Sequence, residues 1–134
     1  MAGLLIAGLF APAHSEAPKE KEKKEEKALT TEKIMEDVHG EGGLRTQVAK
    51  AARLNKIEDA KKPMEVWSKL ATQLKTTKPP RGGKESWEKH CAAYEKQVKV
   101  VADAVKSEKA QTVRDALNSL ARGCNTCHVA HKVQ

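Results

Sequence analysis

Two cysteines and a histidine near the end of the chain have a spacing that suits covalent attachment of a porphyrin. Cys124, Cys127 and His128 lie in the run CNTCH. Residues three apart on a helix share a face, so both thiols can reach the two vinyl groups on one edge of a porphyrin ring. The histidine that follows can then bring its imidazole to the iron as an axial ligand. C-x-x-C-H is the attachment pattern of c-type haem, and the sequence therefore predicts one covalent haem c.

The same cysteines could instead form a redox dithiol or a zinc site. A C-x-x-C pair can be a redox dithiol, but that motif is typical of a helix N-terminus beside a strand, and this chain shows no strand pattern. Zinc is the second alternative, because Cys91, Cys124, Cys127 and one histidine would make a Cys₃His set. Cys91 shares a helical apolar stripe with Trp87 and Tyr94, however, which favours a buried side chain.

The elements that must position these residues are amphipathic helices. Apolar residues recur at spacings of three and four in four segments, and glycines at 40, 42 and 43 interrupt the first of them. The second segment begins near Glu58 or just before Pro63, and residues 78–83, KPPRGG, must form a loop. The predicted helices cover residues 31–52, 58–74, 84–107 and 110–134. Their short links predict an all-α fold, an antiparallel four-helix bundle.

The composition agrees with a helical protein whose core is short of bulky side chains. The 134 residues make one domain, 32% of them are charged, and only 3% are aromatic. A β-sandwich or an α/β core needs more β-branched and aromatic residues. We therefore expect a further hydrophobic group, such as a haem, to help fill the interior. No apolar stretch is long enough to predict a membrane span.

The N-terminal residues are predicted to lie outside the bundle. Residues 3–10, GLLIAGLF, precede Ala-Pro-Ala, the small-x-small pattern of a signal-peptidase site, although no basic residue comes before them. Residues 1–13 are therefore predicted to be a signal peptide, with a disordered N-terminus or one that packs in the core as the alternatives. Residues 14–28 are predicted to be a charged flexible segment, and residues 29–134 the haem-binding bundle. A periplasmic or otherwise exported location follows, which suits c-type haem because it is attached after export.

A C-x-x-C-H motif near the C-terminus of a four-helix chain resembles the class II c-type cytochromes, the cytochrome c′ family with its low-spin methionine-ligated members. The resemblance covers roughly residues 29–134. In that family a loop with Pro and Gly precedes a helix with an early Trp, which matches residues 79–83 and Trp87. A basic residue also follows the haem-binding histidine by four positions, which matches Lys132 and implies that Lys132 lies near the haem. The glycine-rich break after His39 departs from the family pattern.

The resemblance leaves the sixth position of the iron with three alternatives. In methionine-ligated members the ligand lies in the first helix, at the place of Met35, and five-coordinate members have an apolar residue there. Met35 could also be a flexible core filler. His39 lies one helical turn after Met35 and shares its face, so it is an alternative sixth ligand. The third alternative is an open site.

The state of that position determines the expected function. An occupied position implies a cytochrome that carries single electrons between redox partners, and an open one implies a protein that binds a small gas such as NO or CO. No set of catalytic acid, base and nucleophile is visible, so we expect no enzyme. The net charge of +7 favours partner proteins with an acidic docking surface. Nucleic acid is not expected, because basic and acidic residues alternate. The resemblance leaves a homodimer open.

For the remaining histidine, cysteine and aromatic side chains, the sequence predicts only whether each is exposed or buried. His131, one turn after His128, is expected to be exposed, with packing on the haem edge as the alternative. His90 is expected at the surface and Cys91 in the core. Trp67 and Tyr94 are expected to be core residues rather than redox relays.

Overall fold

The computed structural model describes residues 29–132, and every regular element in this range is a helix. The helices are α1 (Thr31–His39), α2 (Leu44–Arg53), α3 (Glu58–Leu74), α4 (Lys84–Lys106) and α5 (Ala110–His131). The predicted all-α bundle is confirmed. The predicted signal peptide at 1–13 and the charged segment at 14–28 lie outside the described residues.

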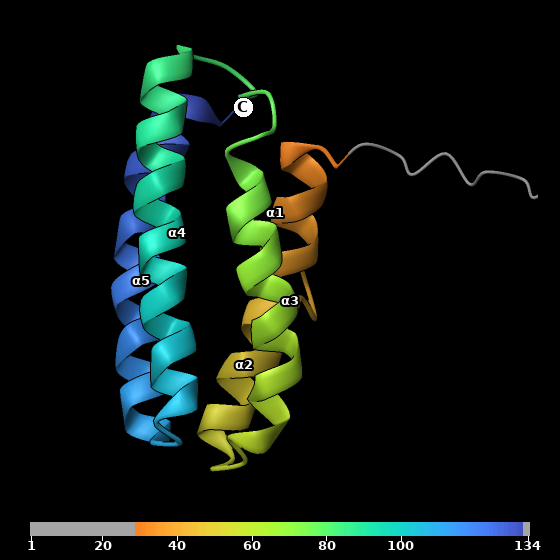
Figure 1. Cartoon of the computed structure of the whole chain (residues 1–134), viewed down its shortest axis with the longest axis vertical. Helices are drawn as coiled ribbons and strands as arrows, with labels where there is room; N and C mark the ends of the chain where they lie inside the picture. The colour runs from red at the N-terminus through yellow and green to blue at the C-terminus, as the bar shows by residue number, and fades with distance from the viewer. Residues whose placement is uncertain (1–28, 133–134) are drawn as a thin grey trace, which may run out of the picture.

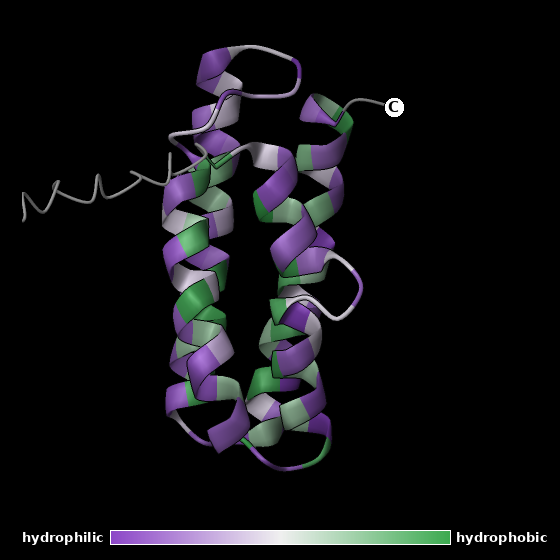
Figure 2. Ribbon diagram, turned by 90° about the vertical axis from the view of Figure 1, so that its right-hand side faces the viewer, coloured by the Kyte–Doolittle hydropathy of each residue, from purple (hydrophilic) through white to green (hydrophobic). Residues whose placement is uncertain are grey.

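The helices alternate in direction through the bundle. Figure 1 shows the chain running down α1 and α2, up α3, down α4 and up α5. Together, α1 and α2 take the place of the first bundle helix. Each helix carries both hydrophobic and hydrophilic residues along its length (Figure 2). The predicted stripes face the core, and its largest fully buried side chains include Trp67, Ile34, Leu74 and Leu120.

The start of α3 differs from one of the two predicted positions. The prediction of a start just before Pro63 is wrong, because α3 begins at Glu58 and contains Pro63. The backbone N–H groups of Asp59 and Ala60 already bond to the carbonyls of Lys56 and Ile57, at 3.0 and 2.9 Å. These bonds start the helix before the proline, which removes a single later donor.

A glycine-rich break separates α1 from α2. Thr30 caps α1 at its start, where its side chain accepts a hydrogen bond of 3.2 Å from the backbone N–H of Lys33. At the other end, Gly42 has a φ of +66°, a conformation that glycine adopts without strain. A Cβ atom on Gly43 would lie only 2.7 Å from the carbonyl oxygen of Val38. Glycine therefore permits the sharp change of direction after α1.

This break leaves one end of the bundle open. The backbone of α2 packs against both α3 and α5, whereas that of α1 packs against α2 and α3 and reaches neither α4 nor α5. The side-chain hydroxyl of Thr31 donates to the carbonyl of Lys78 over 3.0 Å and holds the start of α1 against the α3–α4 loop. The space between α1 and the α4–α5 pair is therefore not filled by helix packing.

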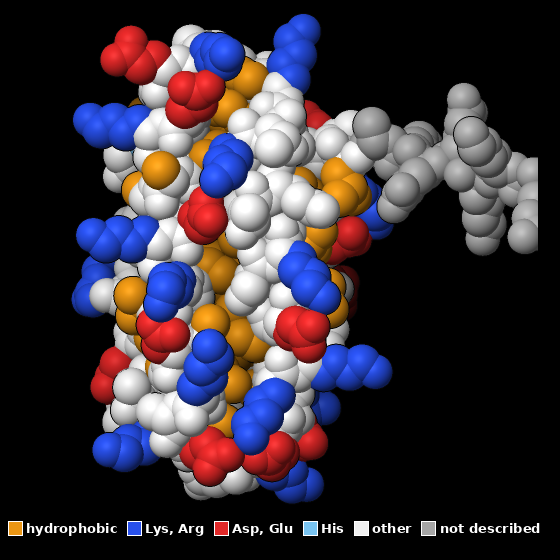
Figure 3. All heavy atoms as spheres, viewed as in Figure 1, with side chains coloured by type: hydrophobic (Ala, Val, Ile, Leu, Met, Phe, Trp, Pro, Cys, Tyr) orange, Lys and Arg blue, Asp and Glu red, His pale blue; other side chains and the backbone are white. Residues whose placement is uncertain are grey.

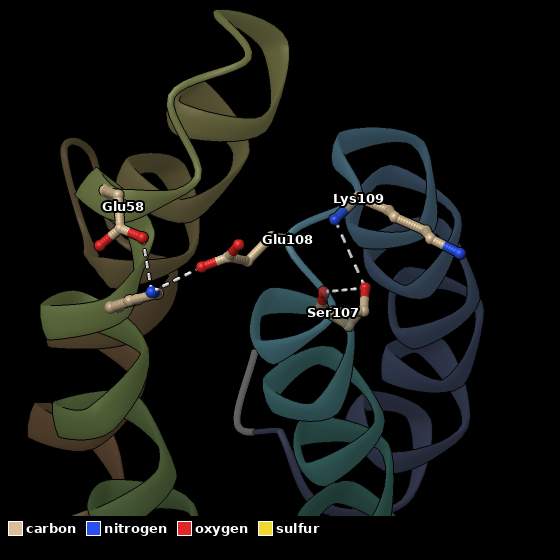
Figure 4. A network of polar contacts seen from close by, with 6 residues as sticks. Glu58, Ser107, Glu108 and Lys109 are labelled. Atoms are coloured by element: carbon tan, nitrogen blue, oxygen red, sulfur yellow. Dashed lines mark hydrogen bonds and ion pairs between the residues drawn. The ribbon is translucent and has the colours of Figure 1, made fainter.

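The opposite end of the bundle is closed by polar contacts. Lys61 of α3 pairs with Glu58 at 2.5 Å and with Glu108 of the α4–α5 turn at 2.9 Å (Figure 4). In that turn, the backbone N–H of Lys109 donates to the hydroxyl of Ser107. These ion pairs are exposed and each contributes little stability. Among the described residues, no helix has the length and apolar character that crossing a membrane requires.

Candidate functional site

A cavity of about 620 Å³ occupies the open end of the bundle. Its walls come from α1, α4 and α5, with contributions from Arg45, Leu74 and Pro80. Its surface is mainly apolar, and its size falls within the range of sites that hold a small organic ligand or cofactor. The cavity lies where α1 is held away from α4 and α5.

Every residue that the sequence singled out for haem binding or iron ligation lines this one cavity. The residues are Met35, His39, Cys124, Cys127, His128 and Lys132. The first two come from α1 and the last four from the end of α5 or just beyond it. The fold therefore brings together two groups that are more than 80 positions apart in the sequence.

The end of α5 presents both thiols to the cavity. The helix continues through the whole C-x-x-C-H motif to His131, so Cys124 and Cys127 lie one turn apart on one face. Both are half-buried, and His128 beside them is exposed. Burial raises the pKa of Cys127, and the neighbouring Cys124 adds to this effect. The Cys124 thiol points back along the helix to the carbonyl of Leu120, at 3.5 Å.

On the other side of the cavity, α1 presents a thioether. Met35 is half-buried and packs against the core, while its neighbours Ile34 and Val38 are fully buried. Met35 thus lies on the inner face of α1, as its spacing predicted. Its sulfur needs no hydrogen-bond partner, so the side chain can adapt to what lies in the cavity.

His39, one turn later, is held by a polar cluster. Its Nε2 lies 2.8 Å from the hydroxyl of Tyr94, and the indole N–H of Trp67 donates to the same hydroxyl over 2.8 Å. The imidazole stands edge-on to both aromatic rings, with centroids 5.8 Å apart in each case. Burial, followed by the charges of Arg45 and His128, lowers the pKa of His39 to about 4. The imidazole is therefore neutral at neutral pH.

The expected exposure of His131 is wrong. Its side chain is 2% exposed, because the α3–α4 loop folds over the last turn of α5. Nδ1 donates to the carbonyl of Arg81 over 2.8 Å, and Nε2 accepts from the hydroxyl of Ser86 over 3.0 Å. A Cβ atom on Gly82 would lie 2.9 Å from Nδ1, so a glycine is needed for this approach. The glycines in the loop were the sequence signal for this contact.

His90 and Tyr94 belong to the wall of the cavity on the α4 side, and Trp67 lies behind this wall in the core. His90 was expected at the surface but is half-buried and lines the cavity, because its ring packs edge-on against that of His131, with centroids 5.2 Å apart. Trp67 is fully buried, as expected. Tyr94 is half-buried, and the apolar surroundings of its phenol raise its pKa.

The zinc alternative finds no support in residues 29–132. No three His, Cys, Asp or Glu side chains in this part of the chain are grouped so as to hold a metal ion. Cys91 is 1% exposed and belongs to the core, as expected. Burial, with smaller contributions from Cys127 and Glu88, raises its pKa to about 12.

The donor set and the mainly apolar lining of the cavity fit a covalently attached haem. Two thiols one turn apart face a mainly apolar space, and an imidazole follows directly. A porphyrin supplies four of the iron ligands itself, so this site needs only one or two from the protein. Arg45 and Lys132 also line the cavity, where their positive charges suit two propionate groups.

Fold and site together define an all-helical bundle with a cofactor-sized cavity and a C-x-x-C-H motif in its wall. In comparisons with protein-family models, with curated proteins and with solved structures, the chain matches none.

Proposed function

We propose that this protein is an exported monohaem c-type cytochrome of the class II kind, which carries single electrons between redox partners. The observation that carries the proposal is the convergence of Cys124, Cys127 and His128 with Met35 on one mainly apolar cavity. An accidental C-x-x-C-H motif would have no reason to face such a space.

Each of these residues has a defined role in the proposal. Cys124 and Cys127 would hold the group as thioethers, and His128 and Met35 would ligate its iron. A haem c bound here would supply reversible one-electron Fe(III)/Fe(II) chemistry. The mainly apolar walls would shield part of the ring from water. Methionine ligation raises the reduction potential relative to ligation by two histidines.

The net positive charge of the chain supports the proposed choice of partner. Arg45 and Lys132 line the cavity, and the whole chain has a net charge of +7. Basic and acidic side chains are intermingled on the face seen in Figure 3, which offers no large field of one sign there. Attraction to an acidic docking surface would therefore act through the net charge, because Arg45 and Lys132 would face the propionates.

An absorption spectrum of the exported protein, ferric and ferrous, with and without carbon monoxide, tests the proposal. We expect a Soret band, sharp α and β bands in the ferrous state, no response to carbon monoxide, and haem that stays on the chain in denaturant. The absence of a Soret band would contradict haem binding altogether. A high-spin spectrum that shifts with carbon monoxide would replace electron transfer with gas binding.

Matched cysteine variants provide the control. Cys124→Ala and Cys127→Ala each remove one proposed thioether, so both should weaken the covalent retention of haem, and the double variant should abolish it. Cys91→Ala removes a thiol that is buried in the core and should retain haem fully. Equal retention in all of these variants would contradict the assigned attachment sites.

A further inference from the structure

One hydrogen-bonded chain leads from the core of the bundle to the wall of the cavity. The indole N–H of Trp67 donates to the oxygen of Tyr94 over 2.8 Å, and that hydroxyl lies 2.8 Å from Nε2 of His39. Trp67 is fully buried, whereas Tyr94 and His39 both line the cavity. The contact between His39 and Tyr94 joins α1 to α4, whose backbones do not meet.

The donors in this chain fix the tautomer of His39. The indole of Trp67 can only donate, so Tyr94 accepts from it and keeps its own proton to give. Nε2 of His39 is the remaining partner of that hydroxyl. If Nε2 carried a proton instead, the hydroxyl proton of Tyr94 would have no acceptor among the residues that the structure describes. The network therefore assigns the imidazole proton to Nδ1 and directs the Tyr94 proton at the lone pair of Nε2.

That lone pair is what an iron ion would need. His39 and Met35 lie one turn apart and line the same cavity, so they compete for the sixth position. A neutral imidazole is a good ligand for iron, and burial in this site favours the neutral form. Position alone would therefore not exclude His39 as the sixth iron ligand.

From this geometry, we infer that Tyr94 selects Met35 as the sixth iron ligand by occupying the Nε2 lone pair of His39. Tyr94 is thus a positioning residue for the proposed electron carrier, and the inference rests on that proposed function. If His39 turned Nε2 to the iron, Tyr94 would lose its acceptor in a half-buried site. The edge-on contacts with the Trp67 and Tyr94 rings, at 5.8 Å, would be lost as well.

The test compares ligation in variants of the haem-loaded protein. Tyr94→Phe keeps the ring but removes the proton that masks His39. Trp67→Phe is the matched control, because both variants lose the Trp67–Tyr94 hydrogen bond and only the first releases His39. The double variant Tyr94→Phe/His39→Leu removes the competing ligand as well. The readouts are the weak ferric band at the red edge of the visible spectrum, which accompanies an iron–methionine bond, and the midpoint potential.

We expect the methionine band in the unchanged protein, in Trp67→Phe and in the double variant. In Tyr94→Phe the band should be lost, the spectrum should stay low-spin, and the midpoint potential should shift downward, because imidazole replaces the thioether. Retention of the band in Tyr94→Phe, or a high-spin spectrum there, would overturn the inference. So would loss of the band in Trp67→Phe, or its absence from the unchanged protein.

Failure of the inference and failure of the proposed function give different spectra. A protein without a Soret band contradicts both. A protein with covalent haem whose ligation ignores Tyr94→Phe contradicts only the selection of the ligand by Tyr94.

Discussion

A hydrogen bond of 2.8 Å from Nδ1 of His131 to the backbone carbonyl of Arg81 joins the last turn of α5 to the α3–α4 loop. Arg81 returns the contact, since its guanidinium donates to the carbonyl of Val129 over 2.5 Å. Trp87 adds a bond of 3.0 Å from its indole N–H to the carbonyl of Thr77, in the same connection. Together these bonds hold the C-terminal end of α5, and with it the C-x-x-C-H motif, against the rest of the bundle.

His131→Ala should therefore lower the free energy of unfolding by about 2–4 kcal/mol, because it removes a buried side chain and the hydrogen-bond partner of the Arg81 carbonyl. Urea titration at neutral pH measures the loss. Val129→Ala is the control on the same turn, since Val129 is 67% exposed, and its effect should stay within about 0.5 kcal/mol. Equal losses in the two variants would contradict the proposed role of the imidazole.

The helices of this protein could be predicted because their apolar stripes repeat at the helical period. The third and fourth predicted helices match α4 and α5, which end at Lys106 and His131. The glycines that interrupt the first helix separate α1 from α2, again as predicted. The positions of helices and of the glycine break depend on residues close together in the sequence, so local patterns predict them.

The contacts that complete the site join residues far apart, and a local pattern in one segment does not identify the partner segment. His131 is buried only because a loop 50 positions earlier folds over it, and nothing in the last turn of α5 indicates this. The bond between His39 and Tyr94 spans 55 positions and depends on how far α1 leans from α4. For the same reason, the sequence leaves Met35, His39 and an open site as alternatives for the sixth position.

The glycine break after α1 provides a second stability test. Gly43→Ala should lower the free energy of unfolding by about 1–3 kcal/mol, because the new Cβ would lie 2.7–2.9 Å from three backbone oxygens. Gly83→Ala is a matched control: Gly83 also caps a helix with a negative φ, and a Cβ there would meet nothing within 4 Å. The unfolding free energies of the two variants, measured by denaturation, separate the steric cost of the new Cβ from the loss of a glycine cap. A loss in Gly83→Ala as large as in Gly43→Ala would contradict the steric explanation.

His39 should make stability depend on pH. Its folded pKa of about 4 lies below the ordinary 6.5, so between these values the unfolded chain binds more protons than the folded protein. Stability must then fall as the pH drops through that window, and the contribution of His39 to the loss is about 2–3 kcal/mol by pH 4.

His39→Gln isolates this contribution, because an amide oxygen can still accept from Tyr94 and does not titrate. Unfolding is measured in urea at pH 7 and pH 4 for both proteins. The unfolding free energy of the unchanged protein should fall more steeply than that of the variant. Parallel pH dependences would show that His39 is protonated as readily in the folded protein as in the unfolded chain.

Counting the reactive thiols among the three cysteines of the chain tests both the covalent attachment of haem and the burial of Cys91. Cys91 is 1% exposed and its pKa is raised to about 12, so the folded protein should not react with an aromatic disulfide reagent at pH 8. In denaturant the thiol becomes accessible and its pKa returns to the ordinary value, and one thiol per chain should then react, because Cys124 and Cys127 are thioethers in the proposed cytochrome. Cys91→Ala should give none. Three reactive thiols would mean that no haem is attached, and rapid reaction of the folded protein would contradict the burial of Cys91.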